Sequence, residues 1–225
     1  MTKHPAPPAA RHRGHGSQGM QFGILLLLLL VTASCSQSPE PLSPLSTDAV
    51  ILAFGDSLTA GTGAAAEASY PAQLERLTGR RVVNGGNPGE LSRGGVARLP
   101  ALLDEYRPEL LILTHGGNDL LRRMDTHETR ENLETMIGLA RERGVEVLLV
   151  AVPTPALLRL RSDPLYTEVG QRLRVPVENG AIAHILSRDA LKADPIHPNG
   201  DGYRHLAERV HQLLIDTGAL PDSPL

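Results

Sequence analysis

One short stretch constrains the fold and the chemistry of this chain more than any other. Residues 50–54 form a wholly apolar run, which Gly55, Asp56 and Ser57 then close. The run has the length of a buried parallel strand and is too short for a helix. Gly55 permits a sharp exit, and the residues from Leu58 onward can begin a helix. Ser57 is therefore expected at a strand end, beside a helix N-terminus.

That position suits a nucleophile. The unpaired N–H groups at the start of a helix favour the negative charge that develops during acyl transfer. A serine after a strand is equally familiar as an N-cap or turn residue. On this stretch alone, both interpretations of Ser57 stay open.

Apolar runs alternate with helical patterns along the rest of the chain. Strands are expected at 50–54, 81–84, 110–113, 145–152 and 175–177, and helices at 70–78, 91–107, 126–143, 167–174, 181–187 and 201–217. Such alternation predicts an α/β fold with a parallel sheet of about five strands. Ligands of these sheets bind outside the carboxyl ends of the strands.

Polar or glycine-rich turns follow each of the first three expected strands. Ser57 comes after the first, Gly89 after the second and Asn118 after the third. The main-chain N–H groups of Ser57 and Gly89 and the side-chain amide of Asn118 could together form an oxyanion hole, because all three are donors at one sheet edge. Asn118 could instead be an ordinary turn residue.

A serine nucleophile needs a base, and His197 is the candidate. A serine hydroxyl is too weak an acid to attack unaided, whereas an imidazole can take its proton. Asp194 lies three residues earlier, in a turn that contains Pro195 and Pro198. On a tight turn its carboxylate could accept the other ring N–H, which is the division of roles in Ser-His-Asp hydrolases.

The N-terminus has the pattern of a targeting segment. Positive charges precede a short apolar core at 22–31, and small residues then lead to Cys35, the only cysteine. We expect a signal peptide over 1–34, of the lipoprotein type with Cys35 lipidated, or else ordinary cleavage near Ala33 or Ser34. Either way the protein is exported. Residues 35–47, rich in Ser and Pro, are expected to form a tether before a domain at 48–225.

Composition argues against nucleic acid as a partner. Aromatic residues make up only 3% of the chain, so base-stacking platforms are scarce. Without residues 1–34 the chain keeps 19 basic and 25 acidic residues, and an acidic surface repels polyanions. The stretch Gly61-Thr62-Gly63-Ala64-Ala65-Ala66 loosely fits a dinucleotide fingerprint, but its glycines begin too far beyond the first strand, and the second strand ends on Asn84 where an acid would be expected.

Four ordered blocks then carry a family resemblance: Gly55-Asp56-Ser57-Leu58, Gly89 after Val83-Asn84, Gly116-Gly117-Asn118-Asp119, and Asp194-Pro195-Ile196-His197-Pro198. Over residues 49–217 the chain resembles the SGNH, or GDSL, hydrolase superfamily, above all its bacterial arylesterase and thioesterase I/lysophospholipase subgroup. The resemblance implies a flavodoxin-like three-layer α/β/α sandwich without metal or cofactor. It also implies a Ser57–His197–Asp194 triad and oxyanion donors from Ser57, Gly89 and Asn118.

The expected function is that of a serine esterase acting on small acyl esters, thioesters or lipids through an acyl-enzyme. One alternative keeps the mechanism and removes O-acetyl groups from polysaccharide. Another is a surface lipoprotein that binds such ligands without turnover. Residues 158–174 are Arg-rich and aromatic-poor. The corresponding region shapes the acyl pocket in the family that the chain resembles, so substrate choice stays open.

Overall fold

The computed structural model describes residues 1–6, 40–154 and 160–222. Met1–Ser36 and Gln37–Leu225 form separate units, and the second holds the whole fold. Residues 1–6 contain neither helix nor strand. The remainder of the expected signal peptide, with Cys35, lies outside the described residues. Within the described part of the chain, no helix has the length and apolarity needed to cross a membrane.

A five-stranded parallel sheet organises the domain. Its strands are β1 (Val50–Gly55), β2 (Arg81–Gly86), β3 (Leu110–Thr114), β4 (Glu146–Val150) and β7 (Val177–Glu178). They lie in the order β2-β1-β3-β4-β7, and every neighbouring pair is parallel. The strand that follows β1 in sequence, β2, pairs with one edge of β1, and the later strands β3, β4 and β7 add in turn on the other side of β1. Such a reversal creates a crevice at the carboxyl ends of β1 and β3.

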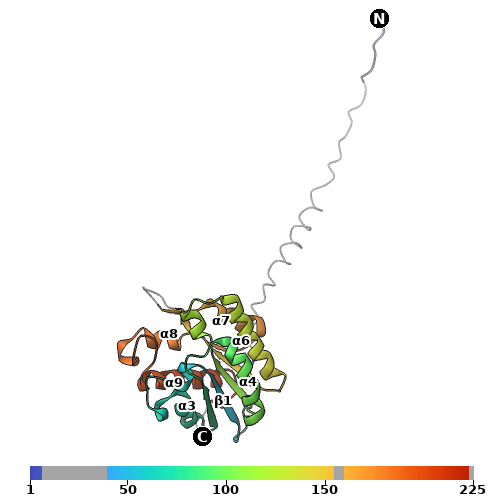
Figure 1. The fold of residues 1–225 in the computed structure, drawn as a ribbon. Helices are drawn as coiled ribbons and strands as arrows, with labels where there is room; N and C mark the ends of the chain where they lie inside the picture. The colour runs from blue at the N-terminus through green and yellow to red at the C-terminus, as the bar shows by residue number, and fades with distance from the viewer. Residues whose placement is uncertain (7–39, 155–159, 223–225) are drawn as a thin grey trace. The chain divides into compact units, whose positions relative to one another are not determined.

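Helices cover both faces of the sheet (Figure 1). On one face α3 (Tyr70–Thr78) packs against α9 (Gly200–Asp216), which also contacts α8 (Ala181–Leu186). On the other, α4 (Ser92–Tyr106) packs against α6 (Thr126–Arg141), and α6 packs against α7 (Pro164–Leu173). The short segments are α2 (Ser57–Ala60), η1 (Ala66–Ala68), α5 (Gly117–Leu121) and η2 (Asp189–Leu191). The predicted three-layer α/β/α architecture is confirmed.

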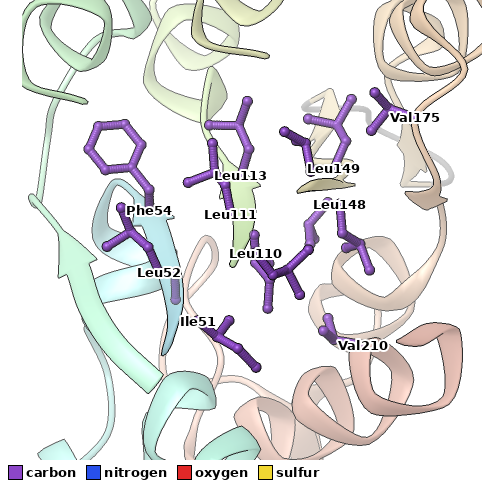
Figure 2. Close-up of a cluster of buried hydrophobic side chains, with 14 of the residues drawn as sticks. Ile51, Leu52, Phe54, Leu110, Leu111, Leu113, Leu148, Leu149, Val175 and Val210 are labelled. Carbon is purple, nitrogen blue, oxygen red and sulfur yellow. The ribbon is translucent and has the colours of Figure 1, made fainter. Parts of the chain in front are cut away.

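The central strands are buried on both sides, which explains their unbroken apolar sequences. Leu110 to Leu113 on β3 have no exposed surface, and neither do Ile51 to Phe54 on β1. Figure 2 shows side chains of this core cluster; among those labelled are Ile51, Leu52 and Phe54 of β1, Leu110, Leu111 and Leu113 of β3, Leu148 and Leu149 of β4, and Val210 of α9. Leucine, valine and isoleucine therefore supply most of the core, as a chain without tryptophan requires.

The limits of two strands differ from the predicted ones, and the fifth strand is Val177–Glu178 where 175–177 was expected. The fourth strand was expected to run to residue 152 but ends at Val150, and Pro153 begins an antiparallel pair of two-residue strands, β5 (Pro153–Thr154) and β6 (Arg161–Ser162). As predicted, α4 runs past Pro100, which lies inside it. The helix tolerates a proline that lacks an N–H when the surrounding packing holds the backbone.

The described part of the expected tether belongs to the domain. Leu42 and Leu45 are buried, and their N–H groups donate to the main-chain carbonyls of Thr217 and Ala219 at 2.9 Å. Ser43 Oγ donates to Glu146 Oε1 at 2.7 Å. The packed part of the chain therefore begins at least six residues before the expected boundary at 48, because Leu42 and Leu45 in the Pro-rich segment are buried beside the end of the C-terminal helix.

Candidate active site

Ser57 occupies a tight turn that the end of β1 makes possible. A side chain at Gly55 would place its Cβ 2.0 Å from the main-chain oxygen of Thr114, so only glycine lets β1 lie this close to β3. Asp56 then caps α2, accepting the Leu58 N–H at 3.0 Å. Ser57 is the first residue of α2, and its N–H has no partner within the helix. The predicted strand-turn-helix setting of Ser57 is confirmed.

The turn before α9 brings His197 to Ser57. Ser57 Oγ lies 3.0 Å from His197 Nε2, across 140 residues of sequence. On the other side of the ring, His197 Nδ1 lies 2.8 Å from Asp194 Oδ2. The three side chains named from the sequence therefore form one continuous hydrogen-bonded row.

The Asp194 carboxylate also shapes the turn that carries His197. Its Oδ1 accepts the main-chain N–H groups of Ile196 and His197, each at 2.8 Å. Burial tends to raise the pKa of Asp194, but the hydrogen bonds from the His197 ring and these N–H groups outweigh it, and the pKa lies below its ordinary value. The carboxylate is thus ionised at neutral pH, beside the ring nitrogen that it accepts from.

Of the other two predicted oxyanion donors, Asn118 lines the pocket beside Ser57 and Gly89 does not. Asn118 lines the same pocket as Ser57 and His197. Its amide nitrogen donates to Asp56 Oδ2 at 3.2 Å and to the main-chain oxygen of Glu90 at 3.1 Å. Gly89 has a φ of 78°, which favours glycine, and is not among the residues that line the pocket. It reaches the site through its neighbour Glu90, which touches Asn118.

The pocket beside Ser57 has a volume of about 330 Å³. Its polar lining residues are Asp56, Ser57, Asn118, Lys192 and His197. The remainder of the lining is apolar and comprises Leu58, Gly117, Leu121, Val152, Pro153, Leu160, Leu186, Pro195 and Ile196. Leu121 and Ile196 are each about two-fifths exposed, at 43% and 41%. Such a site suits an ester with an apolar acyl group.

Several functional neighbours escaped the sequence reasoning. Asp56 was named only as part of a motif, yet it is 2% exposed, and burial raises its pKa despite the opposing hydrogen bond from the Leu58 N–H. Glu90, Arg98 and His115 form a polar cluster behind Asn118. Their spacing gives no signal, because they lie on a turn, a helix and a strand end. Over residues 1–6, 40–154 and 160–222, no three side chains of the metal-binding types gather into a site.

Known proteins resemble this chain in sequence and in fold. The model of the GDSL-like Lipase/Acylhydrolase family matches residues 53–205. An arylesterase of Vibrio mimicus is 30% identical over 84% of this chain and 96% of its own length. Esterase TesA of Pseudomonas aeruginosa is 31% identical over 85% of this chain and 94% of its own. A crystal structure of TesA superposes with a TM-score of 0.67 at 29% identity, over 75% of this chain and 99% of that one.

Proposed function

This chain belongs to the GDSL-like lipase/acylhydrolase family and is an ester-hydrolysing serine hydrolase, and from that premise we propose that Ser57, His197 and Asp194 are its catalytic triad. The observation that supports this most strongly is the row of contacts, 3.0 Å from Ser57 Oγ to His197 Nε2 and 2.8 Å from His197 Nδ1 to Asp194 Oδ2. Both distances allow proton transfer and orientation of the ring.

The first half of the reaction acylates the serine. Ser57 Oγ attacks the ester carbonyl carbon while His197 Nε2 takes the hydroxyl proton, and Asp194 accepts the Nδ1–H of the resulting imidazolium. The carbonyl oxygen becomes an oxyanion. The bond from the carbonyl carbon to the leaving oxygen or sulfur then breaks, and His197 gives its proton to the leaving group. The alcohol or thiol departs, and the acyl group stays on Ser57.

The second half uses water. His197 takes a proton from a water molecule, which attacks the acyl carbon, and Ser57 Oγ leaves with that proton while the carboxylic acid is released. In both halves we propose that the oxyanion accepts hydrogen bonds from the main-chain N–H groups of Ser57 and Gly89 and from the side-chain amide of Asn118. Asn118 already donates to Asp56 and Glu90, so it would share or exchange one of these bonds as the negative charge develops. Protein side chains and water supply every proton and electron pair.

We further propose that the substrate carries an apolar acyl chain, because most of the residues that line the pocket are apolar. Relatives are named arylesterase, esterase and "Thioesterase 1/protease 1/lysophospholipase L1", the last from Escherichia coli at 30% identity. Hydrolysis of an aryl ester series from acetyl to long chain by the purified protein, beside Ser57→Ala, tests both proposals. Turnover must vanish in the variant. A rate that peaks at acetyl and falls with every added carbon would favour deacetylation over acyl hydrolysis.

Export and a lipid anchor at Cys35 are a separate proposal, supported by the sequence pattern at 1–35 alone. Labelling growing cells with a radioactive fatty acid tests it. The protein should carry label and sediment with membranes, and Cys35→Ser should do neither. Equal labelling of both proteins would contradict the anchor without touching the assignment of the triad.

A further inference from the structure

Glu90 is a partly buried residue whose carboxylate the reaction scheme does not use. Its side chain is only 9% exposed. Arg98 Nη2 donates to Glu90 Oε2 at 2.7 Å, His115 Nε2 lies 3.1 Å from the same oxygen, and Asn87 Nδ2 donates to Oε1 at 3.0 Å. Burial tends to raise the pKa of Glu90, but these bonds outweigh burial and lower it to about 2. We call Glu90, Arg98 and His115 the Glu90 cluster.

The protonation of His115 follows from its contacts. The ring is completely buried, and the main-chain N–H of Gly116 donates to Nδ1 at 3.0 Å. An N–H can donate only to a nitrogen that carries no proton. Nδ1 is therefore the acceptor, and the ring proton lies on Nε2, which donates it to Glu90. His115 is thus a neutral hydrogen-bond link rather than half of an ion pair.

Arg98 ties the Glu90 cluster to the ends of two strands. Its Nη1 and Nη2 each donate to the main-chain oxygen of Gly85, near the end of β2, at 3.0 Å. Nη2 also approaches the oxygen of Gly55, the last residue of β1, at 3.3 Å. His115 directly follows β3. The cluster therefore joins the ends of β1, β2 and β3, after which Ser57, Gly89 and Asn118 respectively lie.

The Glu90 cluster is linked to the Asn118 amide by one hydrogen bond and to Gly89 by one peptide bond. The main-chain oxygen of Glu90 accepts from the Asn118 amide at 3.1 Å, and Gly89 is joined to Glu90 by one peptide bond. Displacement of the Glu90 side chain would therefore shift both donors. Buried polar networks of this kind add little net stability compared with apolar packing, so a positioning role explains why one lies here.

We propose that the Glu90 cluster positions the oxyanion donors of this enzyme, with Glu90, Arg98 and His115 as positioning residues that do not touch the substrate. The proposal rests on the proposed function, since it assumes that Asn118 and Gly89 face the oxyanion. Misplacing a catalytic donor by about 1 Å can lower the rate on the order of 100-fold. Loss of the cluster should therefore lower kcat and leave KM nearly unchanged.

The test compares two substrates that differ in one atom, an aryl acetate and the matching aryl thionoacetate, in which sulfur replaces the carbonyl oxygen. Sulfur accepts hydrogen bonds weakly, so the wild-type protein gains less from its oxyanion donors on the thionoester. Arg98→Met should lose roughly 10- to 100-fold in kcat on the acetate, by the displacement argument above, and clearly less on the thionoacetate. Arg98→Lys, which keeps the charge but not the paired contact, should recover part of that loss.

Arg80→Met is the matched control. Arg80 is buried, whereas the Arg98 side chain is 28% exposed, and Arg80 likewise donates to main-chain oxygens, those of Thr78 and Ser46, away from the catalytic pocket. It should change thermal stability without changing kcat on either ester. Equal losses of Arg98→Met on both esters, or an unchanged kcat, would overturn the proposal. If Arg98→Met fails to fold, Glu90→Gln and Arg98→Lys test the proposal instead. The measured quantity is again the ratio of kcat on the aryl acetate to kcat on the aryl thionoacetate.

The outcomes for the two proposals can be separated. Wild-type hydrolysis that Ser57→Ala abolishes tests the triad, and the ratio between acetate and thionoacetate tests the Glu90 cluster. Hydrolysis that survives in Ser57→Ala would overturn the proposed function and the inference with it. Hydrolysis that depends on Ser57, with the same substrate ratio in Arg98→Met as in wild type, would overturn the inference alone.

Discussion

Replacing Asp194 by asparagine should abolish activity while preserving the turn that carries His197. The reason lies in how the two carboxylate oxygens are used. Oδ1 accepts two main-chain N–H groups, from Ile196 and His197, and Oδ2 lies 2.8 Å from His197 Nδ1. An asparagine has one acceptor oxygen and one donor NH₂ group. The oxygen must take the Oδ1 position, because an NH₂ group cannot accept the two N–H groups.

The NH₂ group of that asparagine then faces His197 Nδ1 and donates to it. The ring proton is consequently forced onto Nε2, the nitrogen 3.0 Å from Ser57 Oγ, and this tautomer cannot take the serine proton. Loss of the correct tautomer in such a triad costs on the order of 10⁴-fold in kcat, or about 5 kcal/mol of barrier. Asp194→Ala, which leaves the ring free to choose either tautomer but removes both turn bonds, should be less stable and no less active than Asp194→Asn.

The assay is kcat for an aryl acetate together with thermal unfolding of the same samples. Asp189→Asn is the control on the same loop, because Asp189 is 97% exposed and pairs only with Lys192 among the described residues. It should keep both activity and stability. An Asp194→Asn protein within about 10-fold of wild type would refute the reasoning, since the tautomer argument requires a loss on the order of 10⁴.

The remaining predictions concern the pocket, the acid stability and the N-terminal segment. Ile196→Ala removes about three carbons from a pocket-lining side chain, and at roughly 0.8 kcal/mol per buried methylene it should raise KM for long-chain esters by up to about 50-fold. Leu77→Ala, similarly exposed but distant from the pocket, should leave KM unchanged. The pKa of the Glu90 carboxylate is lowered to about 2, so its ionised form stabilises the fold fully above pH 4.5 and less as the pH falls toward 2. The difference in unfolding free energy between wild type and Glu90→Gln should therefore shrink by about 3 kcal/mol over that range in an acid titration. Leu42→Ala should lower the free energy of unfolding by about 2 to 5 kcal/mol if the segment is part of the core, and a tether would show no change by chemical denaturation.

Sequence reasoning predicted the parts of this molecule that depend on local pattern. The apolar runs of β1 and β3 are buried on both faces of the sheet, so an unbroken apolar sequence was enough to predict a buried strand. The turns after those strands are glycine-rich because the backbones approach closely, as Gly55 shows. Parallel pairing then places Ser57 and Asn118 at one edge without further information. Their proximity could therefore be expected, although their roles remain predictions.

The features that were missed depend on contacts between distant segments. Arg98 looks like a solvent-facing residue of a helix, and only the folded chain brings it to the carbonyl groups of Gly55 and Gly85. Leu42 and Leu45 lie among prolines and serines with no periodicity, so nothing local reveals that they pack beside α9. Packing of this kind cannot be read from spacing, because it is decided by which surface is available after the sheet has formed.

The most direct test of the central claim is to trap the nucleophile. The purified protein, treated with an aryl phosphonate ester, should gain one covalent phosphonyl group per chain, and tandem mass spectrometry should place it on Ser57. His197→Ala should react on the order of 100-fold or more slowly, since it lacks the base that takes the serine proton. A phosphonyl group on another residue, or equal labelling of His197→Ala, would contradict the account of Ser57 as a nucleophile activated by His197.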